Sequence, residues 1–232
     1  MKKTLIISVG NTNIRYGIFK CGSLAMSGIL TSLSAKHIKK ESIDEAFCIS
    51  VNKAKFKRFK MEYDWMDVVE IKKKKRGIIS EYDIDMLGID RYMTVAECQR
   101  SMIFPVVIID TGTADTFDFI NSKGIHIGGF ITPGLTTMAK SLEKFTCGLK
   151  EVIPEDGELK VGKNTEDAMK FGIYTEWVTK ILAFVKMSEK VIGKSTVIVC
   201  GGNSPRIKDY IKDAVIDEDF LLKAIYEYSK DI

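Results

Sequence analysis

The chain has 232 residues, of which 45% are hydrophobic and 28% are charged, a balance typical of a globular protein with a sizeable core. Its 35 basic and 31 acidic side chains leave a formal charge of only +4, too small to favour a nucleic-acid partner. No stretch approaches the roughly 20 apolar residues that cross a membrane. Five scattered cysteines without a CxxC pair argue against a zinc site or a disulfide framework and favour a cytoplasmic location.

The first half of the chain begins with a pattern typical of a β-meander, in which short apolar runs are separated by turn-forming residues. Pro105 marks its end. The predicted elements in chain order are strands over residues 4–9, 14–19 and about 24–31, a short helix after Ser34, a strand near 45–51, a mixed region, and a helix over 90–102.

The second half repeats this order. It restarts with the β-forming run Val106–Ile109, continues the meander through Gly128-Gly129 and turns helical from Pro133. A long helix over roughly 164–188, a strand over 196–200, a glycine turn and a C-terminal helix complete it. We therefore predict two similar α/β domains, residues 1–105 and 106–232, that pack around a cleft.

The repeat includes a distinctive turn. In both copies an apolar strand is followed by a turn that contains a short polar residue, a glycine and a threonine, and then by a second strand. The two copies are Ile6 to Thr12 and Ile108 to Thr113. Glycine lets the backbone turn sharply, and successive N–H groups in such turns form anion-binding sites. Two such turns about a hundred residues apart indicate a nucleotide-dependent phosphotransferase.

The order of motifs is more specific than any one motif. Taken together, the motifs resemble those of the type III pantothenate kinases, in the superfamily of acetate kinase, sugar kinases, Hsp70 and actin. In chain order they are Val9-Gly10-Asn11-Thr12-Asn13, Gly88-Ile89-Asp90-Arg91, Asp110-Thr111-Gly112-Thr113-Ala114, Gly128 to Leu135, Asn164 to Met169, and Cys200 to Pro205.

The resemblance implies two ribonuclease H-like (actin-like ATPase) domains, each with a mixed five-stranded sheet flanked by helices. It also implies phosphorylation of pantothenate by ATP, the first step of coenzyme A biosynthesis. Asp90 would act as general base on the pantothenate hydroxyl. Gly88, Ile89 and Arg91 would bind the same substrate, and Thr165 would reach it across a homodimer interface.

The resemblance assigns the remaining site residues to the nucleotide and its cations. Asp110 would bind a monovalent cation, potassium or ammonium, and Mg²⁺ would accompany the phosphates. The residues implied to contact ATP are Ser8, Val9, Gly10, Asn11, Thr12, Asn13, Arg15, Thr113, Gly201 and Gly202.

Ser8 departs from the family pattern, because family members usually carry Asp at this position. Serine offers one neutral oxygen, whereas Mg²⁺ prefers carboxylates and phosphates. Asp115 lies in the second loop, where the family commonly has Thr. Its position suggests that its carboxylate faces the cleft and replaces the one missing at Ser8.

Two alternatives remain open. The first is a weakened or inactive relative that kept the pocket as a regulatory or ligand-binding protein. The second is a kinase for another small hydroxylated acid. The combination of the Gly88–Arg91 segment with Thr165 favours pantothenate. An ordinary helix-start ion pair for Asp90 and Arg91, and a helix N-cap for Thr165, are the purely structural interpretations of these residues.

Overall fold

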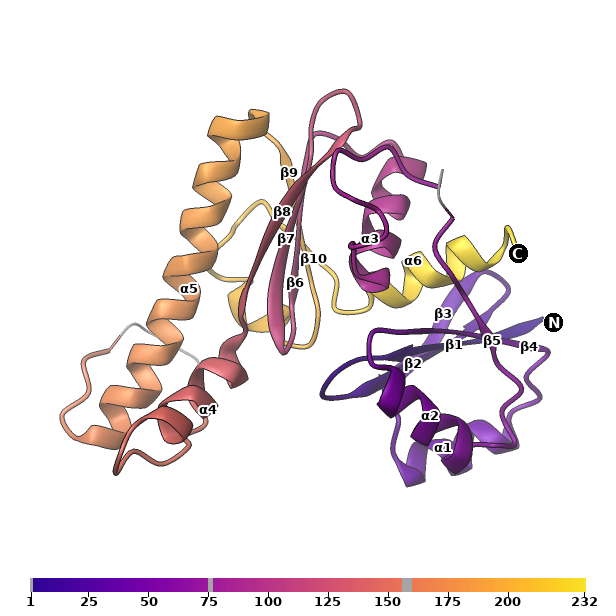
Figure 1. Ribbon diagram of the computed structural model, residues 1–232, viewed down its shortest axis with the longest axis horizontal. Helices are drawn as coiled ribbons and strands as arrows, with labels where there is room; N and C mark the ends of the chain where they lie inside the picture. Colours follow the sequence, from indigo (N-terminus) through magenta and orange to yellow (C-terminus); the bar gives the residue numbers. More distant parts are fainter. Residues whose placement is uncertain (1, 75–76, 156–159) are drawn as a thin grey trace. The chain divides into compact units, whose positions relative to one another are not determined.

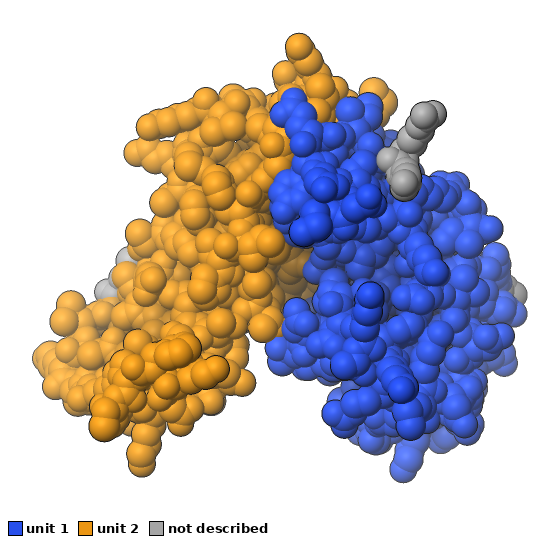
Figure 2. All heavy atoms as spheres, in the orientation of Figure 1, with its two compact units in different colours: residues 1–101, 219–232 blue, residues 102–218 orange. Residues whose placement is uncertain are grey.

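The computed structural model describes residues 2–74, 77–155 and 160–232 (Figure 1). The chain divides into two compact units, Met1–Ser101 with Asp219–Ile232, and Met102–Glu218 (Figure 2). The predicted domains, 1–105 and 106–232, differ from these units in the C-terminal segment, which joins unit 1. No feature of the sequence predicted that the C-terminal segment would join unit 1.

Unit 1 contains one five-stranded mixed sheet with the order β3-β2-β1-β4-β5. β1 pairs antiparallel with β2 and parallel with β4. Its elements are β1 (Lys3–Val9), β2 (Ile14–Lys20), β3 (Ser23–Ile29), α1 (Ser32–Lys40), β4 (Glu45–Ser50), α2 (Lys53–Glu62), β5 (Val69–Glu70), α3 (Ile89–Arg100) and α6 (Phe220–Ser229).

Both faces of β1 are buried, which explains its continuous apolar sequence. On one face, Leu5 and Ile7 join a core with α1 and α2 that includes Phe56 and Phe59. α6 packs on the other face, where α3 accompanies it.

α6 belongs to unit 1 because its apolar side chains have their burial sites there. The ring of Tyr226 stacks on Phe19 of β2 with centroids 4.0 Å apart. A Cβ at Gly17 would lie 3.4 Å from Leu222, so the missing side chain lets the helix approach β2 closely. The apolar face of the helix thus explains why the last segment departs from the predicted domain boundary.

Unit 2 repeats the arrangement with the sheet order β10-β9-β6-β7-β8, in which β6 pairs antiparallel with β7 and parallel with β9. Trp177 is fully buried in its core, with Phe117 and Ile109. The elements are β6 (Val106–Thr111), β7 (Ala114–Ile120), β8 (His126–Pro133), α4 (Leu135–Phe145), α5 (Thr165–Ile192), β9 (Thr196–Cys200), the 3₁₀ helix η1 (Ser204–Ile207) and β10 (Val215–Ile216).

The predicted fold class is confirmed, since two mixed five-stranded sheets carry flanking helices and share one topology. The sequence interpretation missed α2, which it left in a mixed region, and the two-residue edge strands β5 and β10. No helix in the described ranges is long and apolar enough to span a bilayer.

Candidate active site

The first predicted phosphate loop, Gly10–Asn13, connects β1 to β2. The Gly10 N–H donates to the Asn13 carbonyl at 3.0 Å, which closes a tight turn. A Cβ at position 10 would lie 3.0 Å from that same oxygen, so glycine gives the turn room. The side chains of Asn11, Thr12 and Asn13 are exposed. The loop therefore offers accessible backbone and amide groups directly after a buried strand.

Two residues at the start of α2, Asn52 and Lys55, contact this loop, and neither was predicted as a site residue. Asn52 caps the helix by accepting from the Lys55 N–H at 2.9 Å, and its Nδ2 donates to Asn11 Oδ1 at 3.3 Å. The Lys55 ammonium donates to the carbonyls of Thr12 at 2.6 Å and Asn11 at 3.3 Å. Burial, followed by the charge of Arg58, lowers the pKa of Lys55.

Ser8 and Arg15 lie opposite each other on β1 and β2, so their side chains share one face of the sheet. Ser8 is buried. The Arg15 guanidinium donates to Asp219 Oδ1 at 2.9 Å, and the Ser27 hydroxyl donates to the other oxygen of Asp219 at 2.7 Å. Arg15, predicted as an ATP contact, is thus engaged by a carboxylate of its own unit.

The predicted substrate segment, Gly88–Arg91, forms the start of α3, with Gly88 as its N-cap residue. Asp90 lies in the first turn, where its Oδ1 accepts from the Arg91 N–H at 2.9 Å. A Cβ at Gly88 would lie 2.5 Å from that oxygen. The positive end of the helix dipole favours an anion here. Glycine at 88 leaves space for the Asp90 carboxylate.

Arg91 is 5% exposed, and its guanidinium carbon lies 5.1 Å from the centroid of the Tyr82 ring, a cation–π arrangement. The segment that leads into Gly88 is held by Lys73. Its ammonium donates to the carbonyls of Ile84 at 2.5 Å, Asp85 at 3.0 Å and Leu87 at 2.7 Å. This lysine was not predicted as a site residue.

In unit 2 the structure brings Asp110 and the Gly201-Gly202 turn together, because β6 and β9 are parallel neighbours that pair Asp110 with Cys200. Gly201 has φ +84°, and a Cβ there would collide with Asp110 Oδ1 and with the backbone of Thr111. Glycine is therefore required at position 201 both for its conformation and for space. The Thr111 hydroxyl also donates to the Cys200 carbonyl at 2.8 Å.

The second loop, which carries Thr113, is tied to the start of α4. The Thr113 carbonyl accepts from the Gly134 N–H at 3.1 Å and from the Thr137 hydroxyl. A Cβ at Gly134 would collide with the Gly112 carbonyl, so glycine lets α4 begin directly against the loop. The Gly-rich approach to α4 in the sequence thus has a steric cause.

Asp115 does not supply the accessible carboxylate suggested by its place in the sequence. It is fully buried, and one oxygen accepts from Trp177 Nε1 at 2.9 Å and from Lys180 Nζ at 2.7 Å, both on α5. Its other oxygen has no hydrogen-bond partner among the described residues. Burial raises the pKa of Asp115 to about 6, and the contacts with Lys180 and Trp177 offset part of that rise.

Thr165 is the first residue of α5, and it is exposed. The N-cap of the helix is Asn164, whose side chain accepts from the Asp167 N–H at 2.9 Å, so the hydroxyl of Thr165 is not needed for that role. Thr165 lines a cavity of about 690 Å³ together with Met169 of α5 and with Lys150 and other residues of the 148–155 segment.

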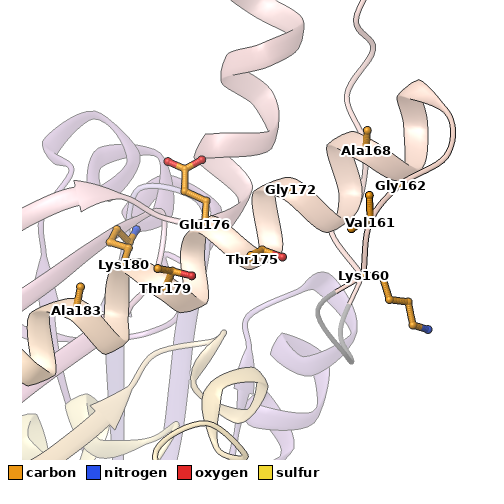
Figure 3. Close-up of a pocket in the computed structure, with 10 residues that line it drawn as sticks. All are labelled: Lys160, Val161, Gly162, Ala168, Gly172, Thr175, Glu176, Thr179, Lys180 and Ala183. Atoms are coloured by element: carbon orange, nitrogen blue, oxygen red, sulfur yellow. The ribbon is translucent and has the colours of Figure 1, made fainter.

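A second cavity, of about 700 Å³, runs along α5 (Figure 3). Its lining is mixed: Val161, Ala168 and Gly172 are apolar, whereas Glu176 and Lys180 carry charges. Within the ranges that the structure describes, no group of three or more His, Cys, Asp or Glu side chains is placed to hold a metal ion.

Comparison with known proteins agrees with these motifs. The family model described as "Type III pantothenate kinase" matches residues 4–187. A type III pantothenate kinase from Finegoldia magna is 26% identical and covers 98% of each chain. One from Kosmotoga olearia is 30% identical over 95% of this chain and 93% of its own.

Among solved structures, a protein described as a Baf family transcriptional activator from Campylobacter jejuni has a TM-score of 0.65 at 21% identity, with 98% of each chain covered. Component A of (R)-2-hydroxyglutaryl-CoA dehydratase from Acidaminococcus fermentans has a TM-score of 0.51 at 14% identity, with 99% of each chain covered. These two likenesses support the actin-like ATPase fold alone. With the family match over most of its length, the chain belongs to the type III pantothenate kinase family, whose members are phosphotransferases.

Proposed function

We propose that this protein transfers the γ-phosphoryl group of ATP to the hydroxyl of pantothenate and forms 4′-phosphopantothenate, the first step of coenzyme A biosynthesis. The observation that carries the proposal is the placement of Asp90 in the first turn of α3, beside a glycine that leaves its carboxylate room. Family membership supplies the reaction class and ATP as phosphoryl donor.

Asp90 serves as the general base. As the pantothenate hydroxyl attacks the γ-phosphorus, the carboxylate accepts its proton, and the bond from phosphorus to the bridging oxygen of ADP breaks. Gly88, Ile89 and Arg91 bind the same substrate, and the planar guanidinium of Arg91 suits the carboxylate of pantothenate. Thr165 contacts pantothenate from the partner of a homodimer.

The nucleotide is assigned to the glycine turns. Backbone N–H groups of Gly10–Asn13 bind the phosphates, and this turn adjoins Ser8, Val9 and Arg15. Thr113 contacts ATP from the second loop, and Gly201 and Gly202 border the adenosine. Magnesium would neutralise part of the phosphate charge. Because Ser8 offers only a neutral oxygen, the ion would be held mainly by the phosphates and water.

Asp110 is assigned to a monovalent cation, potassium or ammonium. Its carboxylate lies beside the backbone of Thr111, with Gly201 packed against both. A carboxylate with neighbouring carbonyl oxygens suits a hard cation. Such an ion would add positive charge near the phosphates during transfer.

A homodimer is the proposed assembly, with α5 as the contact helix. Its groove of about 700 Å³ contains Gly172, and apart from the chain neighbours and the nearby helix backbone no described atom lies within 4 Å of a Cβ built there. Small residues on a helix allow close approach of another helix, and Ala168, Gly172 and Ala183 of α5 are among the residues that line the groove in Figure 3.

The experiment measures ADP release by the purified protein with ATP, Mg²⁺ and K⁺, with and without pantothenate, and identifies the product by mass. Pantothenate-dependent release with a mass of 4′-phosphopantothenate supports the proposal. ADP release with another hydroxylated acid, and none with pantothenate, would replace pantothenate as the substrate and retain phosphoryl transfer from ATP to a hydroxyl as the reaction.

A second candidate function rests on Ser8. The buried neutral side chain leaves this position without the carboxylate usual in the family, which favours a relative that binds ligands without efficient turnover. Binding of ATP or pantothenate in the absence of ADP release would support this alternative over the kinase.

A further inference from the structure

Two lysine side chains in unit 1 bind backbone carbonyls, one within the predicted phosphate loop and the other in the residues that lead into the predicted substrate segment. The Lys55 ammonium on α2 donates to the Thr12 and Asn11 carbonyls at 2.6 and 3.3 Å. The Lys73 ammonium donates to three carbonyls, those of Ile84, Asp85 and Leu87, at 2.5, 3.0 and 2.7 Å. Because a lysine ammonium has three donors, Lys73 is fully engaged by the segment that ends at Gly88.

Binding these carbonyls also orients backbone N–H groups. The two groups of a trans peptide unit point in opposite directions, and the one cis bond in the described chain is Phe104-Pro105. When Lys55 binds the carbonyls of Asn11 and Thr12, the N–H groups of Thr12 and Asn13 are directed away from it. These are N–H groups that the proposed function assigns to the phosphates.

The same geometry applies to the substrate segment. The Leu87 carbonyl shares its peptide unit with the Gly88 N–H, so Lys73 sets the direction of that N–H at the start of α3. Two residues further on is Asp90, and the backbone at Gly88 borders its carboxylate, since a Cβ built at Gly88 would lie 2.5 Å from Asp90 Oδ1. A shift of the preceding loop would move the proposed base.

Neither Lys55 nor Lys73 behaves as an ordinary solvent-exposed surface lysine. A solvated lysine keeps its ammonium in water, whereas Lys55 and Lys73 are each half-buried and bonded to two or three carbonyls. Holding a long side chain in one geometry costs conformational entropy. Hydrogen bonds from a charged donor are stronger than neutral ones and offset this cost.

We infer that Lys55 and Lys73 are positioning residues, Lys55 for the ATP-phosphate loop and Lys73 for the pantothenate segment. Neither residue contacts a reacting atom in this assignment. The inference rests on the proposed function for the identity of the two ligands. Its distinctive consequence is a crossed pattern, in which each lysine controls the binding of a different ligand.

The test uses Lys55→Met and Lys73→Met in the full-length protein, since methionine retains most of the apolar stem and removes the charge. Matched controls are Lys57→Met on α2 and Lys72→Met next to Lys73, both of which replace exposed lysines. Dissociation constants of ATP with Mg²⁺ and of pantothenate are measured separately by calorimetry. The thermal midpoint of each variant is recorded alongside.

Loss of the Lys55 contacts is expected to weaken ATP binding about tenfold and leave pantothenate binding within about twofold, on the scale of one lost charged hydrogen bond. Loss of the Lys73 contacts is expected to do the reverse. Both controls bind as the wild type does. Equal losses for both ligands in either variant, or variants indistinguishable from their controls, would overturn the inference.

Hydrogen exchange without ligand separates this inference from the proposed function. Lys55→Met is expected to speed exchange of the Thr12 and Asn13 amides, and Lys73→Met that of the Gly88 amide, relative to the controls. If the wild type binds neither ligand, the proposed function fails, and the exchange pattern still decides the positioning roles. Lys55→Arg and Lys73→Arg, which retain a charged donor, serve if a methionine variant does not fold. In the arginine variants a smaller effect with the same crossed pattern supports the role, whereas equal weakening of both ligands, or no difference from the controls, contradicts it.

Discussion

The guanidinium of Arg15 on β2 donates to the carboxylate of Asp219, the residue before α6, across 2.9 Å although the two residues are 204 positions apart in the chain. Their side chains are only 22% and 21% exposed. This ion pair fastens the returning C-terminal segment to the strand that follows the first predicted phosphate loop. It therefore connects the unit boundary with the proposed ATP site.

We predict that Asp219→Ala lowers the free energy of unfolding by about 1–3 kcal/mol, because it removes a partly buried, charge-assisted hydrogen bond and that of Ser27. Urea unfolding measures the change. Asp213→Ala, which removes an exposed carboxylate of the preceding segment, is the control. A loss no larger than that of the control would show that the ion pair does not stabilise the unit.

The buried carboxyl of Asp115 predicts a pH dependence of stability. Its pKa is about 6 in the folded protein against an ordinary value of 3.8, because burial disfavours the charged form. The folded state therefore holds this proton more tightly than the unfolded state does. As pH rises from 3.8 to about 6, the carboxyl loses its proton first in the unfolded chain, and its contribution to stability falls.

Across that window the free energy of unfolding of the wild type should fall by roughly 2–3 kcal/mol relative to Asp115→Asn. Chemical unfolding at a series of pH values measures the difference between the two proteins. In Asp115→Asn the loss of the Lys180 ion pair shifts the free energy of unfolding by a similar amount at every pH in this window. It therefore does not alter how the difference between the two proteins changes with pH. A difference that stays constant with pH would contradict the assignment.

Ser8→Asp is predicted to raise kcat about tenfold or more, since a carboxylate at this position would help to hold Mg²⁺ beside the phosphates. Arg15, on the same face of the sheet, would favour the added negative charge. ADP release at several Mg²⁺ concentrations measures the effect, and Ser8→Asn controls for side-chain size. Equal activity of the Asp and Asn variants would show that this position does not serve the metal.

Asp90→Asn is predicted to lower kcat by about 10²–10⁴, because the amide does not accept the proton of the pantothenate hydroxyl. Pantothenate binding, measured by calorimetry, should change little, as the amide keeps the size of the side chain. Asp83→Asn in the preceding loop is the matched control. Retention of kcat in Asp90→Asn would remove Asp90 as the general base.

Gly172→Arg is predicted to convert the proposed homodimer to a monomer. Beyond its chain neighbours and the nearby helix backbone, a Cβ at this position meets no described atom within 4 Å, and arginine favours a helix over glycine, so the fold of the single chain should persist. Sedimentation over a range of concentrations measures the assembly, with Glu189→Arg near the end of the same helix as control. A wild type that stays monomeric, or a variant that stays dimeric, would exclude this face.

The elements that sequence analysis found share a strong local pattern. β1 and β6 are short, apolar and bounded by turns, and α5 follows an Asn-Thr-Glu-Asp start that does cap the helix through Asn164. α2 was missed because its two buried residues, Phe56 and Phe59, stand among lysines and arginine and produce little periodicity.

Lysines in charged runs ordinarily indicate a solvated surface, so nothing in the sequence distinguished Lys55 from its exposed neighbour Lys57. The difference arises when α2 is placed beside the Gly10–Asn13 loop. Asp115 shows the opposite case, since its position next to the second loop suggested an accessible carboxylate, whereas β7 turns it towards α5. Alternation along a strand decides which face a side chain occupies.

The sequence by itself determined the duplicated α/β plan, the family and the short motifs at strand ends, because hydrophobic period and turn-forming residues act between near neighbours. Only the tertiary structure decided which unit takes the C-terminal helix, which carboxylates are buried and which lysines bind backbone carbonyls in or beside the predicted ligand segments. Those outcomes depend on contacts between residues tens to hundreds of positions apart. Such contacts are set by packing and by the pairing of polar groups in three dimensions, and no local pattern records them.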